Sequence, residues 1–281
     1  MVILAPQDVT VVSAAVSETH EVNTSVKRND VVNSEYRFLV LDAPQSILRC
    51  QPGQFFHLLC PVTTQHQPYL RRPMSIYGYS VEKGELHFLY KVTGEGTRAL
   101  SDLKPGDPLN VLGPLGKGFS IKPDWQNLLL LARGVGLATL APLAQEARRL
   151  NRKLTTICSA RSDDVLMSVD YFQQMGAEVI TVTDAAGTSD MDNIRRIITQ
   201  KIESGSVDAM YTCGSNRLLK LLQDIGNTHN IPGEIALEQQ MACGLGMCQC
   251  CVRSFNRAGV ISQERVCREG PVFAIQEALA W

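Results

Sequence analysis

The sequence predicts a multidomain α+β protein, in which an antiparallel β-barrel precedes an α/β unit with a parallel sheet and a small third unit. Three observations support this fold class. Short apolar segments separated by Pro-Gly and Lys-Gly turns fill the first part of the chain. Apolar runs then alternate with helical segments, and cysteines gather near the C-terminus. We therefore expect domains at residues 1–123, 124–232 and 233–281.

The first unit is expected to be a barrel because its strand-like segments are short, rich in β-branched or aromatic residues, and bounded by turns. Several short strands at such spacing are typical of antiparallel barrels. The expected strands are Thr10–Val16, Tyr36–Leu41, Gln54–Cys60, Glu85–Lys91 and Pro108–Leu112.

The second unit alternates strands with helices. Leu128–Ala132 is a continuous apolar run, as expected of a parallel strand that is buried on both faces. The helix expected next, Ala138–Leu150, ends among basic residues, which suit a helix C-terminus. Further strands are expected at Thr155–Cys158, Glu178–Val182 and Ala209–Cys213. This alternation predicts βαβ units and a parallel sheet.

The third unit contains a cysteine motif with the spacing C-x4-C-x2-C-x15-C. This spacing is typical of the four thiolate ligands of a 2Fe-2S cluster. Gly244 and Gly246 allow the loop to curl and to turn backbone N–H groups toward cluster sulfurs. A unit this small usually needs a metal or disulfides to hold it. The predicted cluster ligands are Cys243, Cys248, Cys251 and Cys267.

A structural zinc knuckle is the alternative interpretation of these cysteines. Zinc sites favour two C-x2-C pairs with a longer spacer, whereas here a glycine-bearing x4 gap precedes a single x2 gap. Cys250 is not included among the ligands, because adjacent residues 250 and 251 cannot easily both point inward. The spacing therefore favours the iron-sulfur cluster.

Composition and charge narrow the class of protein. The 281 residues are 44% hydrophobic and 20% charged, as in soluble globular proteins, and the formal net charge of −1 gives no sign of nucleic-acid binding. No membrane span is expected, because no segment has ~18 uninterrupted apolar residues. Met1–Asp8 lacks the positive region of a signal peptide. The nine cysteines, an odd number with four at ligand spacing, favour a reducing cytoplasm.

Two segments of the barrel unit have residues suited to a bound dinucleotide. An arginine offers a planar fork of donors to a pyrophosphate, and Arg72 is the candidate for this role. Ser75, on the same expected strand, would reach a polar edge of a ring system. Gly94, Gly96 and Thr97 would open a helix whose first N–H groups receive phosphate. The two segments together favour a flavin.

A glycine turn follows the first strand of the second unit. Gly134 and Gly136 would allow a tight turn and a close approach of phosphate. The pattern lacks the third glycine of the usual dinucleotide-binding fingerprint, so an ordinary strand-to-helix turn stays open.

Taken together, these motifs resemble the ferredoxin-NADP reductase superfamily. The resemblance rests on Arg-Pro-x-Ser, Gly-x-Gly-Thr, the later Gly-x-Gly and Cys213-Gly214, in that order. The cysteine motif, the segment Leu237–Cys243 before it and the loop Leu112–Phe119 look more narrowly like the electron-transfer subunits of two-subunit dihydroorotate dehydrogenases.

The resemblance implies a cofactor role for named residues. FAD would be bound by Arg72, Pro73, Met74 and Ser75, with Ser75 near the reactive edge of the isoalloxazine ring. Its pyrophosphate would lie on Gly94, Gly96 and Thr97. NAD or NADP would face Gly134 and Gly136, with Cys213 and Gly214 beside the nicotinamide.

The sequence departs from the resembled family on the dinucleotide side. Those proteins usually carry a glycine where this chain has Arg133 and a proline where it has Thr139. An acidic Asp-Gly-Ser pattern is often present where this chain reads Ala185–Thr188. Arg133 would either bind an extra phosphate or crowd the dinucleotide, so a relay subunit with a degenerate NAD(P) site stays open.

The resemblance implies hydride exchange between NAD(P)H and FAD, and single-electron transfer between FAD and the cluster. Electrons would pass to or from a separate catalytic flavoprotein or oxidoreductase subunit, so we expect a hetero-oligomer. No side chain is expected to act as a catalytic acid or base. Service to an electron-bifurcating ferredoxin:NADP oxidoreductase, a sulfide dehydrogenase or another multi-subunit oxidoreductase is the alternative to dihydroorotate oxidation.

Overall fold

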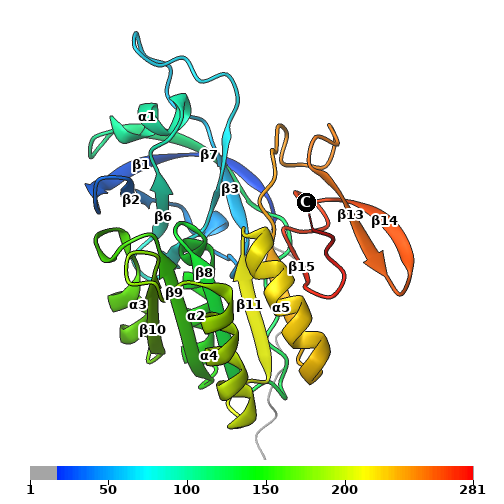
Figure 1. Cartoon of the computed structure of the whole chain (residues 1–281). Coiled ribbons are helices and arrows are strands. Elements are labelled where there is room, and N and C mark those ends of the chain that lie inside the picture. The colour runs from blue at the N-terminus through cyan, green and yellow to red at the C-terminus, as the bar shows by residue number, and fades with distance from the viewer. Residues whose placement is uncertain (1–17, 281) are drawn as a thin grey trace, which may run out of the picture.

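The computed structural model of the protein describes residues 18–280. An antiparallel sheet occupies the upper part of Figure 1, and a second sheet with its helices occupies the lower part. The last part of the chain lies beside both sheets (Figure 1). The strand expected at Thr10–Val16 lies outside the described residues.

The first sheet has seven antiparallel strands in the order β4-β3-β7-β1-β2-β6-β5. Because β4 and β5 remain at its edges, the sheet forms a half-barrel. The expected antiparallel arrangement is present, but the barrel is not closed. Helix α1 follows β6 at Glu95–Ser101. The strands are β1 (His20–Val31), β2 (Tyr36–Asp42), β3 (Phe55–Leu58), β4 (Arg72–Ser75), β5 (Gly78–Ser80), β6 (Glu85–Lys91) and β7 (Pro108–Leu115).

The four expected strands that lie within the described part of this sheet are confirmed as β2, β3, β6 and β7. Strand β1 was not predicted, because its sequence mixes charged and apolar residues and most of its side chains are exposed or half-buried. It is held by its neighbours, since it pairs with both β2 and β7. Tertiary pairing therefore outweighs the weak local signal.

The second sheet has six strands in the order β10-β9-β8-β11-β12-β15. Its first five strands run parallel, and the expected strands at 128–132, 155–158, 178–182 and 209–213 are confirmed. The strands are β8 (Asn127–Arg133), β9 (Lys153–Ala160), β10 (Glu178–Thr183), β11 (Ala209–Cys213), β12 (Gly233–Ala236) and β15 (Val272–Ala274).

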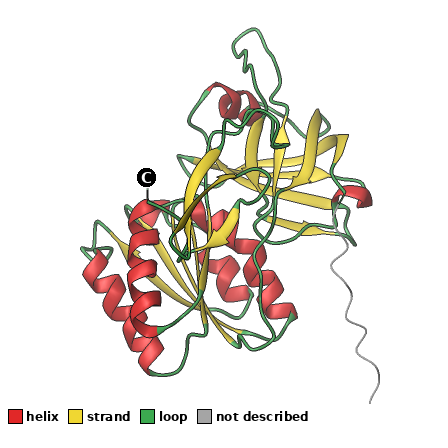
Figure 2. Ribbon diagram, turned by 90° about the vertical axis from the view of Figure 1, so that its right-hand side faces the viewer, coloured by secondary structure: helices red, strands yellow, loops and turns green. Residues whose placement is uncertain are grey.

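Helices cover both faces of the parallel sheet, as Figure 2 shows. Alternate residues of β8 point to opposite faces: Leu128 and Leu130 join the core under α2 and α3, whereas Leu129 and Leu131 join the core under α4 and α5. All four leucines are fully buried, as expected of a continuous apolar run in a parallel sheet. The helices are α2 (Gly136–Arg149), α3 (Val169–Gln174), α4 (Met191–Glu203) and α5 (Asn216–His229).

The last part of the chain is joined to the parallel sheet. Strand β12 extends the sheet in parallel, and β15 returns to pair with β12 in the antiparallel sense. The sheet thus continues across position 232, where we expected a domain boundary, and that boundary stays a prediction. Between the two strands lie the cysteine loop and the hairpin of β13 (Val252–Arg257) and β14 (Val260–Arg265).

Phe273 connects this hairpin to the sheet. It lies on β15 and stacks on Phe255 of β13 with ring centroids 4.1 Å apart. Both rings belong to the core that includes Cys251 and Cys267. The cysteine segment is therefore packed against the α/β core. Among residues 18–280, no helix combines the length and the apolar character needed to cross a membrane.

We expect Phe273→Ala to lower the free energy of unfolding by about 3–5 kcal/mol, because truncation leaves a cavity in a closed apolar core. Urea titration measures this change. The matched control is Val260→Ala, on the exposed side of β14, for which a change within about 0.5 kcal/mol is expected. Equal unfolding midpoints for both variants would contradict the assigned role of Phe273.

Candidate functional site

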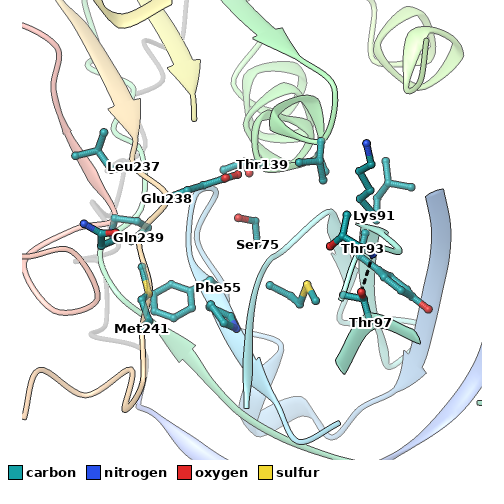
Figure 3. A pocket seen from close by; sticks show the side chains of 17 residues that line it. Phe55, Ser75, Lys91, Thr93, Thr97, Thr139, Leu237, Glu238, Gln239 and Met241 are labelled. Atoms are coloured by element: carbon teal, nitrogen blue, oxygen red, sulfur yellow. Dashed lines mark hydrogen bonds between the residues drawn. The ribbon is translucent and has the colours of Figure 1, made fainter. Parts of the chain in front are cut away.

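A cavity of about 290 Å³ lies where the half-barrel meets helix α2 and the segment after β12. Strands β3, β4 and β6 form one wall, and residues 237–241 form another. Figure 3 shows side chains of all these elements directed at the same space. Protein cavities of roughly this size and larger bind small molecules. The cavity is therefore the first candidate for a cofactor site.

Strand β4 supplies three of the predicted flavin residues to this cavity. Pro73, Met74 and Ser75 all line it. The strand is fixed by antiparallel pairing with β3, in which Ser75 stands opposite Phe55, another lining residue. The pairing places the Ser75 hydroxyl inside the cavity (Figure 3).

Arg72 lies outside the cavity lining and faces the start of helix α1. A Cβ added to Gly96 would lie only 2.7 Å from Arg72 Nε, so the guanidinium packs on the glycine backbone. Gly94 is the N-cap of α1, and Thr97 in its first turn lines the cavity. The structure thus brings together the two predicted flavin segments, although residues 76–93 separate them in the sequence.

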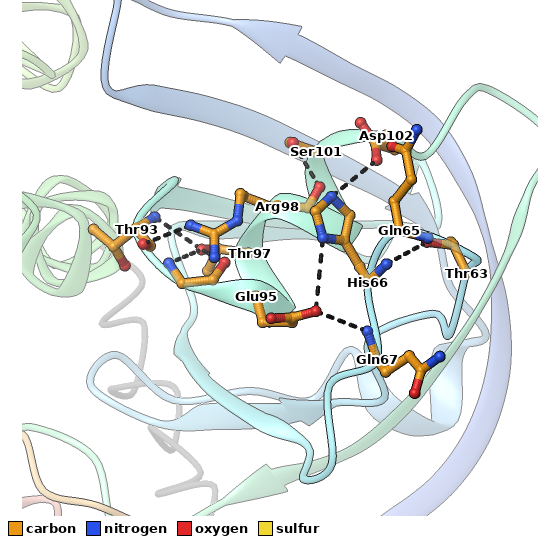
Figure 4. Close-up of polar contacts among 11 residues, drawn as sticks. Thr63, Gln65, His66, Gln67, Thr93, Glu95, Thr97, Arg98, Ser101 and Asp102 are labelled. Atoms are coloured by element: carbon orange, nitrogen blue, oxygen red, sulfur yellow. Dashed lines mark hydrogen bonds and ion pairs between the residues drawn. The ribbon is translucent and has the colours of Figure 1, made fainter.

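The turn before α1 is held by Thr97. Its Oγ1 accepts hydrogen bonds from the backbone N–H groups of Thr93 at 2.9 Å and Gly94 at 3.0 Å. Figure 4 shows the long loop between β3 and β4 fastened to the same helix. His66 of this loop lies 3.8 Å from a carboxylate oxygen of Glu95 and 3.7 Å from one of Asp102. The loop therefore contacts both ends of α1 through His66, and Thr97 holds the turn before the helix.

The residues predicted to bind the dinucleotide lie on the α2 side of the cavity, behind the side chains that line it. Gly134 and Gly136 form the turn from β8 into α2, and Cys213 ends the neighbouring strand β11. A Cβ on Gly136 would lie 3.1 Å from the Cys213 carbonyl oxygen, so the two segments touch. None of the four predicted residues 134, 136, 213 and 214 lines the cavity itself, although Val135, Ala138 and Thr139 do.

Glu238 is a residue of the site that we did not predict. It follows β12 and lines the cavity, and its carboxyl group would lie 3.4 Å from a Cβ on Gly214. Partial loss of hydration in these surroundings raises the pKa of the carboxyl group. Burial and the nearby Glu238 also raise the pKa of Cys213, whereas a hydrogen bond with Thr139 lowers it. The available signal was an acidic residue two positions after the end of a strand, β12.

Arg133 forms an ion pair with Asp184. Its guanidinium donates to both carboxylate oxygens of Asp184, at 3.0 and 2.5 Å, and also to Ser159 Oγ at 3.2 Å. The side chain thus reaches from the end of β8 across β9 to the end of β10. The hydrogen bonds from Arg133 and Ser189 lower the pKa of Asp184 to about 2. In this structure the Arg133 cation is therefore paired with a carboxylate.

The cysteine loop has the backbone of an anion-binding nest. Gly244 and Gly246 have φ angles of +70° and +80°, which glycine adopts without strain. The Leu245 N–H donates to Cys243 Sγ at 3.4 Å. Burial opposes ionisation of the Cys243 thiol, but hydrogen bonds from loop N–H groups and from Cys248 outweigh it and lower its pKa to about 6. The loop therefore stabilises a thiolate.

The four predicted ligands form two pairs, because Cys243 interacts with Cys248 and Cys251 interacts with Cys267. A 2Fe-2S cluster takes two thiolates on each iron, which this pairing matches. Across residues 18–280, no three metal-binding side chains already stand together as a ligand set. The fit therefore rests on the paired thiols and on the nest. Cys250, which we did not predict as a ligand, is exposed, as is Cys248.

Arg265 braces the cysteine loop from the hairpin side. Its Nη1 donates to the Gly246 carbonyl at 3.0 Å, and the same guanidinium forms an ion pair with Glu269 at 2.5 Å. The Cys267 N–H donates to Cys251 Sγ at 3.4 Å. These contacts hold both halves of the motif in place. None of them was predicted, because they join residues through the folded hairpin.

Comparison with protein families gives two matches. Residues 23–119 match a family described as the oxidoreductase FAD-binding domain. Residues 238–278 match a family described as the iron-sulfur cluster binding domain of dihydroorotate dehydrogenase B. The first match covers the half-barrel and the second covers the cysteine loop and its hairpin.

Curated relatives match most of the chain. The chain is 35% identical over 236 residues to the electron transfer subunit of dihydroorotate dehydrogenase B (NAD(+)) from Desulforamulus reducens, covering 84% of this chain and 89% of that protein. The subunit of the same name from Caldanaerobacter subterraneus subsp. tengcongensis is 36% identical over 228 residues, covering 81% and 87%.

A solved structure shares the fold of most of the chain. The NADH-dependent reduced ferredoxin-NADP oxidoreductase, studied for flavin-based electron bifurcation, matches with a TM-score of 0.76 at 25% identity. The match covers 92% of this chain and 90% of that chain.

We expect Arg133→Gln to raise the pKa of Asp184 from about 2 toward the usual value of about 4, because the substitution removes the cation that stabilises the carboxylate. In the unsubstituted protein, stability from this pair is present above the usual pKa and is lost as the pH falls through about 2. Carboxyl NMR titration measures the shift. Arg195→Gln, which removes the ion pair of Arg195 with Asp224, is the control and should leave Asp184 unchanged. An unchanged Asp184 pKa in Arg133→Gln would refute the pairing.

Proposed function

This chain belongs to the family of the electron-transfer subunits of NAD-linked dihydroorotate dehydrogenase B, and from this premise we propose how its residues serve that function. A protein of this family is an oxidoreductase subunit of pyrimidine biosynthesis that passes electrons between NAD(P)(H), FAD, a 2Fe-2S cluster and a separate catalytic subunit. The observation that carries the proposal is that strand β3 borders both the cavity, through Phe55, and the cysteine loop, through the contact of His57 with Gly244.

When bound, FAD exchanges hydride with a nicotinamide and single electrons with the cluster. The residues proposed to hold FAD fall into two groups. Arg72 and the first turn of α1, with Gly94, Gly96 and Thr97, offer a planar cation and N–H donors suited to the pyrophosphate. Pro73, Met74 and Ser75 offer a wall for the ring system, with one hydroxyl as a hydrogen-bonding group.

The nicotinamide dinucleotide is proposed to approach from the α2 side. Gly134 and Gly136 add no side chains to the turn before α2, Cys213 ends the adjacent strand, and Gly214 follows it. Glu238 lies between this wall and the cavity, where its carboxyl group is suited to hydrogen-bond a ring amide. NAD is the proposed cofactor, because Arg133 is neutralised by Asp184 and the curated relatives are named for NAD(+).

The cluster is proposed to be held by Cys243, Cys248, Cys251 and Cys267 in a small C-terminal domain. Leu245 and Met247 extend from the same loop and are 43% and 81% exposed. Exposed apolar side chains at a redox centre suit a docked protein, because burial of their surface stabilises the complex. We assign this loop tip to the contact with the catalytic subunit in a cytoplasmic hetero-oligomer.

A second candidate function is a subunit of an electron-bifurcating ferredoxin:NADP oxidoreductase. The specific observation in its favour is the TM-score of 0.76 to a structure of that class. The higher identity to the dihydroorotate dehydrogenase subunits favours the first function. Co-purification with a dihydroorotate-oxidising flavoprotein, followed by dihydroorotate-dependent NADH formation, distinguishes the two.

An anaerobic visible spectrum of the purified protein, recorded before and after addition of NADH or NADPH, tests the electron route. We expect NADH to bleach both the flavin and the iron-sulfur bands, and to do so faster than NADPH. Flavin and cluster bands that neither donor changes would instead establish a relay subunit with a degenerate dinucleotide site.

We expect Cys248→Ser to lose the iron-sulfur absorbance and retain FAD, because the thiolate belongs to the cysteine loop and the cavity lies outside that loop. Cys250→Ser is the matched control in the same loop, and it should retain iron and labile sulfide near two each per chain. Equal cluster loss in both variants would refute the ligand assignment. If the unsubstituted protein contains zinc and no iron, the site is a zinc knuckle.

A further inference from the structure

His57 on strand β3 is a polar side chain that is completely buried. Neither ring nitrogen has a hydrogen-bond partner within the described part of the chain. Burial, with a smaller effect of the Arg71 charge, lowers the pKa of the imidazole to about 4. The ring is therefore neutral and carries one N–H donor. A buried donor without a partner costs free energy, so its retention calls for an explanation.

The position of His57 in the strand directs it away from the interior of the half-barrel. Successive side chains of a strand point to opposite faces. Phe56 and Leu58 join the core of the half-barrel, whereas Phe55 and His57 point to the other face. The rings of Phe55 and His57 lie 5.8 Å apart, and Phe55 lines the proposed flavin cavity. The ring of Phe55 therefore lies between His57 and that cavity.

The far edge of the imidazole abuts the cysteine loop. A Cβ added to Gly244 would lie 3.0 Å from His57 Nε2 and 3.1 Å from Cε1. Gly244 directly follows Cys243, the proposed ligand whose sulfur already accepts a backbone N–H. The unpartnered nitrogen therefore faces the turn that would surround the cluster.

We propose that His57 donates a hydrogen bond to the sulfur of the 2Fe-2S cluster site, as a positioning residue that the half-barrel supplies to the cysteine loop. This inference rests on the proposed function, in that a cluster occupies the loop. Hydrogen bonds to cluster or cysteine sulfur raise the reduction potential, because they stabilise the more negative reduced state. His57 thereby sets the potential of the cluster from the wall that it shares with the flavin cavity.

The first test is an EPR-monitored redox titration of the full chain with His57→Leu and His57→Gln. We expect His57→Leu to lower the ratio of reduced to oxidised cluster about tenfold at a given potential, which is about 59 mV for a one-electron couple. His57→Gln, whose amide keeps an N–H donor, should recover part of the difference. His229→Leu, at the end of α5, is the control and should keep the original potential. The same potential in His57→Leu as in the control would overturn the proposal.

The second test uses the unsubstituted protein, so it can be carried out even if the His57→Leu variant does not assemble its cluster. Protein labelled with ¹⁵N-histidine is reduced and studied by pulsed EPR, and we expect a weak coupling between one imidazole nitrogen and the cluster spin. Absence of that coupling in a protein with full iron and sulfide content would overturn the proposal. Absence of iron and sulfide from the unlabelled protein would instead refute the proposed function.

Discussion

Strand β3 is the wall that the two candidate cofactor sites share, and their arrangement depends on it. Its alternating side chains close the half-barrel core on one face and present Phe55 and His57 on the other. Phe55 borders the cavity and His57 borders the cysteine loop. Electron transfer between bound groups requires a short and rigid separation. A strand paired on both sides, here with β4 and β7, supplies that rigidity.

The last part of the chain depends on the parallel sheet for its position. Strands β12 and β15 add to that sheet, and Phe273 joins the hairpin to its core. The chain between them therefore leaves and returns at one edge, which places residues 237–241 against the cavity and the cysteine loop against β3. The sheet edge thus fixes the geometry of both sites, although the sheet itself contributes few side chains to them.

Electrostatics differ between the two sites in a way that suits their ligands. Around the cysteine loop, N–H groups and the carbonyl-bound Arg265 favour negative sulfur. On the side proposed for the dinucleotide, Arg133 forms an ion pair with Asp184, and the surroundings of Glu238 raise the pKa of its carboxyl group. The first site stabilises added negative charge, whereas the cation of the second site is paired with a carboxylate of the protein.

The sequence by itself determined the elements whose physical cause is local. The apolar run of β8, the short strands of the half-barrel, the segments at Arg72–Ser75 and Gly94–Thr97 and the cysteine spacing each follow from residue type and period. Tertiary structure alone decided which of these elements meet. Several contacts join residues far apart in the sequence, namely those of Arg72 with Gly96, Arg133 with Asp184, Glu238 with Gly214, His57 with Gly244, and β1 with its two neighbouring strands. Such contacts depend on sheet order and chain reversal, which no local pattern encodes.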